Sequence, residues 1–131
     1  MAPNLAECLR DERYVSLTTF RRSGEPVPTP VWFIPQPNGT LLVYTGATSG
    51  KVKRLRREPR CTVAPCDVRG RVHGDALSAE GIVLETEVDE VRQRLVRRYG
   101  WQARTFLGLS RLRRRGRPDD EVGLRITGTA G

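Results

Sequence analysis

The stretch from Leu41 to Pro59 constrains the fold more than any other part of the chain. Its residues, LLVYTGATSGKVKRLRREP, predict a short β-strand over 41–45, a turn of small residues and then a basic helix. Glu58-Pro59 ends this helix, because the residue before a proline is disfavoured in the α region. A strand end and a helix start must therefore lie together. The start of a helix suits an anion, since its first N–H groups are unpaired and its dipole is positive there.

This predicted helix start carries the side chains expected of a phosphate site. Thr45, Thr48 and Ser49 supply hydroxyl groups, and Lys51 and Lys53, the only lysines of the chain, lie in the first turn. The alternative is a capped helix with a solvated basic face. The remainder of the chain favours the phosphate site.

The length and composition bound the class of protein. The 131 residues predict a single domain over 1–131, with no run of 18 apolar residues and no signal-peptide pattern at the N-terminus. We expect a soluble, cytoplasmic protein without a membrane span. Three cysteines, an odd number, argue against a disulfide framework, and a single histidine, His73, argues against a metal site.

The net charge of +8 and the pI near 10.4 raise nucleic acid as a partner. Against this, the few aromatic residues do not alternate with arginines as a base-stacking surface requires. A basic surface that binds a polyanionic small molecule explains the charge equally well.

Two prolines mark the predicted strand over 27–34, VPTPVWFI. Pro28 and Pro30 are two residues apart, so the two missing N–H groups point to the same side of the strand. This pattern predicts an edge strand or a bulge where a barrel opens. It also predicts room for a ligand beside Thr29, Val31 and Trp32, and both readings can hold together.

The remaining elements alternate between strands and short helices. We expect strands over 14–20, over 61–64 up to Pro65, and over 121–127. Residues 71–77 and 82–86 predict one further strand that is bent or broken, with a bulge at Gly81. We expect helices over 3–12, 87–99 and 101–112, followed by a basic loop over 113–118 whose role the sequence leaves open. This order predicts an α+β protein that is mainly antiparallel β, a six-stranded closed or split β-barrel with short flanking helices.

The order of these elements, with YTGATSGKVKRLRREPR following TPVWF, resembles the pyridoxamine phosphate oxidase-like superfamily of flavin and deazaflavin proteins. The resemblance covers Tyr14 to Thr127. TPVWF and LRREPR are typical of the actinobacterial branch that uses the deazaflavin coenzyme F-420. The resemblance implies a split β-barrel of the FMN-binding type that forms a homodimer with cofactor at the subunit interface.

The resemblance also implies a set of cofactor-binding residues. Ser49, Gly50 and Lys51 would hold the cofactor phosphate. Tyr44 and Thr45 match the superfamily's strand-end pattern, and Thr45 would lie beneath the phosphate. The further implied contacts are Lys53 and Arg54 toward the phosphate or an acidic tail, residues 66–71 near the cofactor, and Thr29, Pro30, Val31 and Trp32 along its ring.

The chemistry implied is hydride transfer between the cofactor ring and an unidentified small organic substrate. Such an enzyme needs no acid–base pair, and we assign no catalytic residue; the sequence has no GxSxG elbow and no recognisable cysteine–histidine nucleophile motif. The oxidase's Arg-x-His pattern near the C-terminus is absent, which argues against vitamin B6 oxidation.

Four hypotheses follow for the function. The first is an F-420-dependent oxidoreductase, and the second is an FMN-dependent reductase or oxidase of the same fold. The third is a non-catalytic F-420-binding protein. The fourth is a small basic nucleic-acid-binding barrel, whose affinity would fall steeply with salt.

Overall fold

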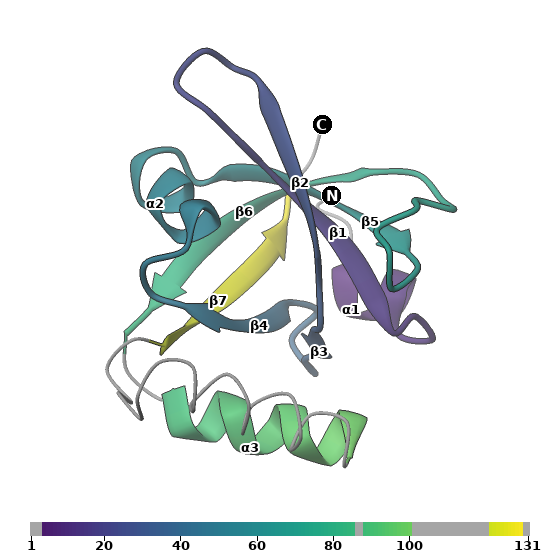
Figure 1. Cartoon of the computed structure of the whole chain (residues 1–131). Helices are drawn as coiled ribbons and strands as arrows, with labels where there is room; N and C mark the ends of the chain where they lie inside the picture. The colour runs from purple at the N-terminus through teal and green to yellow at the C-terminus, as the bar shows by residue number, and fades with distance from the viewer. Residues whose placement is uncertain (1–3, 86–87, 101–120, 130–131) are drawn as a thin grey trace.

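One curled antiparallel sheet forms the body of the protein (Figure 1). The computed structural model describes residues 4–85, 88–100 and 121–129. The sheet order is β2-β1-β5-β6-β7-β4-β3. The strands are β1 (Tyr14–Phe20), β2 (Pro26–Val31), β3 (Ile34–Pro35), β4 (Leu41–Gly46), β5 (Arg60–Cys66), β6 (Leu77–Leu84) and β7 (Glu121–Gly128); the helices are α1 (Leu5–Leu9), α2 (Gly50–Arg57) and α3 (Val88–Tyr99). This architecture confirms the predicted α+β split barrel.

The predicted strand over 27–34 is divided in two, which gives seven strands where six were expected. Its first part, β2, pairs with β1, and its second part, β3, pairs with β4. These two parts lie at opposite ends of the sheet order, so Trp32-Phe33 joins the two edges of the curled sheet. Pro28 and Pro30 lie on the edge strand β2, opposite Thr18 and Ser16 of β1. The predicted edge position of the two prolines is confirmed.

The inward faces of the strands and α2 form the main core. Val15 and Leu17 of β1 are buried in it, and α2 covers one side through Val52 and Leu55. The predicted bulge at Gly81 is wrong, because the pairing of β6 with β7 runs through this residue without interruption. A Cβ at Gly81 would lie 3.0 Å from the Leu55 side chain. The glycine therefore allows α2 to approach the sheet closely.

Two other predicted strand boundaries are also wrong. β5 continues through Pro65 to Cys66, whereas the sequence suggested an end at Pro65. The Pro65 carbonyl accepts a hydrogen bond from the His73 N–H. Because the nitrogen and the carbonyl of one strand residue point to the same side, the N–H that proline lacks is absent on the His73 side, and the pairing with β1 is not affected. Residues 71–76 form no strand beyond an isolated bridge between Cys66 and Val72.

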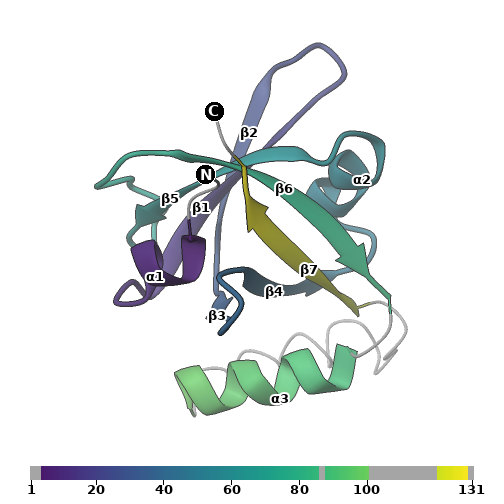
Figure 2. The same ribbon diagram turned by 180° about the vertical axis from the view of Figure 1, so that it is seen from behind.

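The helix α3 lies below the curled sheet in both views, next to β3 and β4 (Figures 1 and 2). Val91, Leu95 and Tyr99 form a second buried cluster with Ile34 and Leu42. This confirms the apolar face predicted for the helix, except at position 88, whose side chain lies outside the described part. Gly100 follows the helix with φ 65°, which confirms its predicted role as the stop.

The remaining helices differ in extent from the prediction. α1 covers five residues where ten were expected, and Asn4 caps it by accepting a hydrogen bond from the Glu7 N–H at 3.0 Å. The predicted helix over 101–112 and the basic loop over 113–118 lie outside the described residues. None of the described helices is long and apolar enough to cross a membrane.

Candidate functional site

The first turn of α2, directly after β4, is the centre of the candidate site. Ser49 precedes the helix with φ −65° and ψ 153°, the extended backbone of an N-cap residue. Its side chain makes no capping bond, and its Oγ is buried without a hydrogen-bond partner among the described residues. A buried polar group left unpaired is unfavourable by about 1–3 kcal/mol. The turn thus offers an unsatisfied hydroxyl at a helix N-terminus, a position suited to a phosphate.

The guanidinium of Arg54 lies over the same turn. Although Arg54 stands in the second half of α2, a Cβ added at Gly50 would come within 2.7 Å of its Nη1. Nε of Arg54 donates a hydrogen bond of 2.6 Å to Oγ1 of Thr19, a fully buried residue of β1. A positive side chain therefore lies at the positive end of the helix dipole. An anion placed there would interact favourably with both the guanidinium and the helix dipole.

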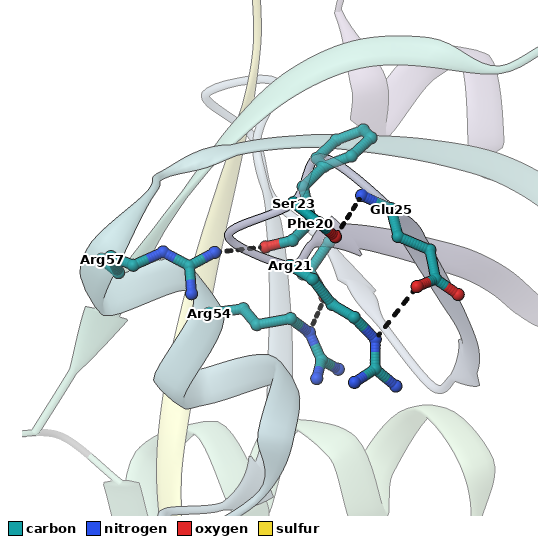
Figure 3. Close-up of polar contacts among 7 residues, drawn as sticks. Phe20, Arg21, Ser23, Glu25, Arg54 and Arg57 are labelled. Atoms are coloured by element: carbon teal, nitrogen blue, oxygen red, sulfur yellow. Dashed lines mark hydrogen bonds and ion pairs between the residues drawn. The ribbon is translucent and has the colours of Figure 1, made fainter.

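Two further arginines belong to this corner, and Figure 3 shows them around Arg54. Nη2 of Arg57 donates to the Phe20 carbonyl at 2.6 Å, while Nε of Arg21 lies 3.9 Å from a carboxylate oxygen of Glu25. Burial, followed by the charges of Arg21 and Arg57, lowers the pKa of Arg54. The first turn of α2 contains no acidic residue to offset this charge. This corner is therefore electropositive, a property that suits a phosphate.

The other residues predicted near this end of the cofactor lie on β4 and α2. Tyr44 and Thr45 project to opposite faces of the sheet, because successive strand side chains alternate. Tyr44 packs against the cluster under α3, whereas Thr45 is half-buried on the inward side. Lys51 is half-buried in the first turn of α2, and Lys53 is exposed. The structure thus brings Ser49, Gly50 and Arg54 together and directs Tyr44 elsewhere.

Trp32, predicted to contact the cofactor ring, packs against α3. Its ring stacks on Tyr99 with the centroids 5.0 Å apart and an interplanar angle of 18°. Trp32 remains half-buried, so part of its surface is open. It lies in the same cluster as Tyr44.

The other three predicted ring contacts lie on the edge strand β2. Val31 packs against the main core, and Thr29 is half-buried on the same face. Pro30 is exposed on the opposite face, where a Cβ at Gly70 would lie 3.6 Å from its ring. The turn over 67–70, part of the segment expected near the cofactor, therefore lies beside this edge strand.

Thr19, Arg21 and Arg57 belong to the site but were missed in the sequence. The period-two pattern of β1 did hold one signal, because Val15, Leu17 and Thr19 share its inward face. A threonine at a core position needs a hydrogen-bond partner. Which partner it finds depends on how α2 packs, and the strand pattern contains no information on that.

A cavity of about 120 Å³ lies between α3 and the sheet, away from the α2 start. Its lining is largely polar and includes Arg94, which donates hydrogen bonds of 2.6 Å to Gln36 and 2.7 Å to Glu90. No residue of α2 lines it. Within the described ranges, no group of three or more potential ligands could hold a metal ion.

The cysteines give a testable prediction about reactivity. Burial, with a smaller contribution from Glu80, raises the pKa of Cys61 to about 12, and burial also raises the pKa of Cys66, with smaller contributions from Asp67 and Glu12. Because the thiolate is the reactive form, iodoacetamide at about pH 8 is expected to label exposed Cys8 and to spare Cys61 in the folded protein. Peptide mass spectrometry measures this. Equal labelling of Cys8 and Cys61 without denaturant would contradict it.

Comparison with solved structures shows the same fold in several proteins. A conserved hypothetical protein from Mycobacterium tuberculosis is 21% identical with a TM-score of 0.68, over 95% of this chain and 78% of that one. The heme storage protein HutZ from Vibrio cholerae is 14% identical with a TM-score of 0.67, over 95% and 87%. A protein described as an F-420 reductase is 18% identical with a TM-score of 0.62, over 95% and 93%. At these low sequence identities, the structural similarity establishes the fold alone.

The family comparison is more specific. The family model described as pyridoxamine 5′-phosphate oxidase matches residues 1–129, nearly the whole chain. A search of curated proteins found no match. The match to the family model spans every described strand, including the β4–α2 junction where Ser49 and Arg54 meet. The chain belongs to the pyridoxamine 5′-phosphate oxidase family.

Proposed function

We propose that this protein is an oxidoreductase that binds coenzyme F-420 and transfers a hydride between it and an unidentified small organic substrate. The observation that carries the proposal is the buried, unpaired Ser49 Oγ at the start of α2. It lies at the N-terminus of α2, where the Arg54 guanidinium also lies, so the donors present fit a phosphate group.

Two features favour F-420 over FMN within this proposal. The first is the resemblance of TPVWF and LRREPR to the branch that uses the deazaflavin. The second is the arginine cluster of Arg21, Arg54 and Arg57, which provides positive charge for a ligand with an acidic glutamate tail. The FMN-dependent alternative uses the same phosphate site, so a direct comparison of the two cofactors is required.

When bound, F-420 supplies the hydride-transferring ring, and the chain has to bind, orient and shield it. Ser49, Gly50 and Lys51 would hold the phosphate. Lys53 and Arg54 would assist there or along the tail, and Thr45 would lie beneath the phosphate. Along the ring we place Thr29, Pro30, Val31, Trp32 and Tyr44. No side chain of this set is required to act as acid or base in the hydride transfer.

We also propose that the protein works in the cytoplasm as a homodimer, with residues of both subunits at the cofactor. The exposed apolar side chains of Val68 and Val72 support this, and Val68 belongs to the turn over 67–70 that lies beside the edge strand β2. Size-exclusion chromatography with light scattering at several concentrations tests the dimer.

A fluorescence titration of protein from a host without the deazaflavin tests the cofactor. F-420 is expected to bind tightly and FMN weakly. A preference for FMN would establish the FMN-dependent alternative, and binding of neither would contradict the proposal and favour a nucleic-acid partner. Oxidation of reduced F-420 with a panel of unsaturated substrates tests catalysis. Tight binding without turnover of any of them would favour the non-catalytic alternative.

A further inference from the structure

We infer that Thr19 is a positioning residue for the phosphate site: its buried hydroxyl fixes the Arg54 guanidinium over the first turn of α2. This inference rests on the proposed function and adds a residue that the resemblance does not include. Thr19 lies on β1, 35 residues before Arg54 in the chain.

Thr19 and Arg54 form a partly buried hydrogen-bonded pair between β1 and α2. Thr19 is fully buried, and its Oγ1 accepts a hydrogen bond of 2.6 Å from Nε of Arg54. An arginine has five N–H donors in a rigid planar fork. The bond to Nε therefore restrains the direction of the guanidinium and leaves the four donors of Nη1 and Nη2 for a ligand. Nη1 is the atom that lies over Gly50.

The position of the Arg54 guanidinium favours a role in ligand binding over a purely structural role. The guanidinium is held at the positive end of a helix dipole, where a cation is unfavourable. Arg57 and Arg21 bring two more positive charges to it, and the pKa of Arg54 is lowered by burial and by both of them. The unpaired Ser49 Oγ belongs to the same turn. Every one of these unfavourable features is relieved by an anion that accepts from Ser49 and Arg54.

Replacement of Thr19 by valine tests the inference, because valine has nearly the same shape but cannot accept the hydrogen bond. We expect Thr19→Val to weaken F-420 binding by about tenfold, because Arg54 would no longer be aligned for its charge-assisted hydrogen bond to the phosphate. Binding of the phosphate-free deazaflavin chromophore should not change. Thr19→Ser, which keeps the hydroxyl, should restore affinity close to that of the unaltered protein.

A double-mutant cycle separates positioning from a general effect on the fold. In an Arg54→Ala background, Thr19→Val should cause little further loss, because the residue through which Thr19 acts is gone. A loss that persists in that background, or that affects the phosphate-free chromophore equally, would overturn the inference. Normal F-420 binding by Thr19→Val would do so as well.

Gly50→Ala provides a second variant in case Thr19→Val does not fold. Its Cβ would stand 2.7 Å from Nη1 and would displace the flexible end of Arg54 from the turn. Alanine favours the helix more than glycine, so we expect unchanged or higher thermal stability together with weaker F-420 binding. The part of the loss that acts through Arg54 should disappear in the Arg54→Ala background, so a loss of undiminished size there contradicts the role of Arg54.

The two levels of the hypothesis fail differently. If the unaltered protein binds neither F-420 nor FMN, the proposed function and this inference are both wrong. If it binds F-420 and the Thr19 and Gly50 variants bind equally well, only the positioning role is wrong.

Discussion

Tyr99→Phe is expected to lower the free energy of unfolding by about 2–3 kcal/mol, because it removes a hydroxyl on which buried backbone groups depend. The Tyr99 hydroxyl accepts a hydrogen bond of 3.2 Å from the Phe33 N–H. Its own proton is shared between the carbonyl oxygens of Phe33 at 2.9 Å and Arg13 at 2.8 Å. Phenylalanine leaves the buried Phe33 N–H without this partner.

The location of this hydroxyl explains why the effect should be large. Phe33 belongs to the two-residue connection where the edges of the sheet meet, and Tyr99 is the last residue of α3. One side chain therefore attaches the helix to the point at which the barrel closes. The ring of Tyr99 also stacks on Trp32, and phenylalanine retains that contact.

Urea unfolding of Tyr99→Phe beside Tyr14→Phe measures this contribution. Tyr14 is a half-buried residue of β1, and its hydroxyl has no hydrogen-bond partner among the described residues, so its replacement is expected to change stability by less than about 0.5 kcal/mol. A shift of the urea midpoint at an unchanged slope identifies a true loss of stability. Equal shifts in the two variants would show that the Tyr99 network does not stabilise the fold.

Lys51→Ala is expected to weaken F-420 binding by about 1.5–3 kcal/mol, the range for a hydrogen bond to a charged group. Lys51 is half-buried in the first turn of α2, where solvent screens its charge less than that of an exposed side chain. The loss should be smaller for the phosphate-free chromophore. Fluorescence titration of both ligands measures the difference.

Lys53→Ala is the matched control for this prediction. It removes the same charge from the same helix, but Lys53 is exposed, so its attraction for the ligand is screened and its loss should cost less than about 1 kcal/mol. Circular dichroism and thermal unfolding should show that both variants fold. Equal affinity of Lys51→Ala and the unaltered protein would contradict the assignment of the phosphate site to α2.

Several features of the protein were determined by short stretches of sequence. The junction of β4 and α2 was predicted from the small residues before Ser49 and from Glu58-Pro59, and α2 ends where that pair predicts. The edge position of β2 followed from Pro28 and Pro30, whose missing donors exclude a central strand. Such features depend on backbone preferences of neighbouring residues, so the local sequence contains the necessary information.

Other features were decided by the tertiary structure. The continuity of β6 through Gly81 reflects how closely Leu55 approaches from α2, and the division of the strand over 27–34 reflects closure of the barrel. A glycine or a proline shows that the backbone is unusual at its position. It does not show whether the cause is a bulge, a turn or a neighbour that approaches closely.

The same distinction applies to the candidate site. The sequence alone predicted the helix start and the residues that we propose to bind a phosphate there, because hydroxyls and lysines follow one another along the chain at that point. The contact of Arg54 with Thr19 joins residues 35 apart, and that of Tyr99 with Phe33 joins residues 66 apart. These partners meet only when α2 and α3 pack against particular strands. Periodicity determines which face of a strand is buried, whereas only the folded chain decides which distant side chain reaches it.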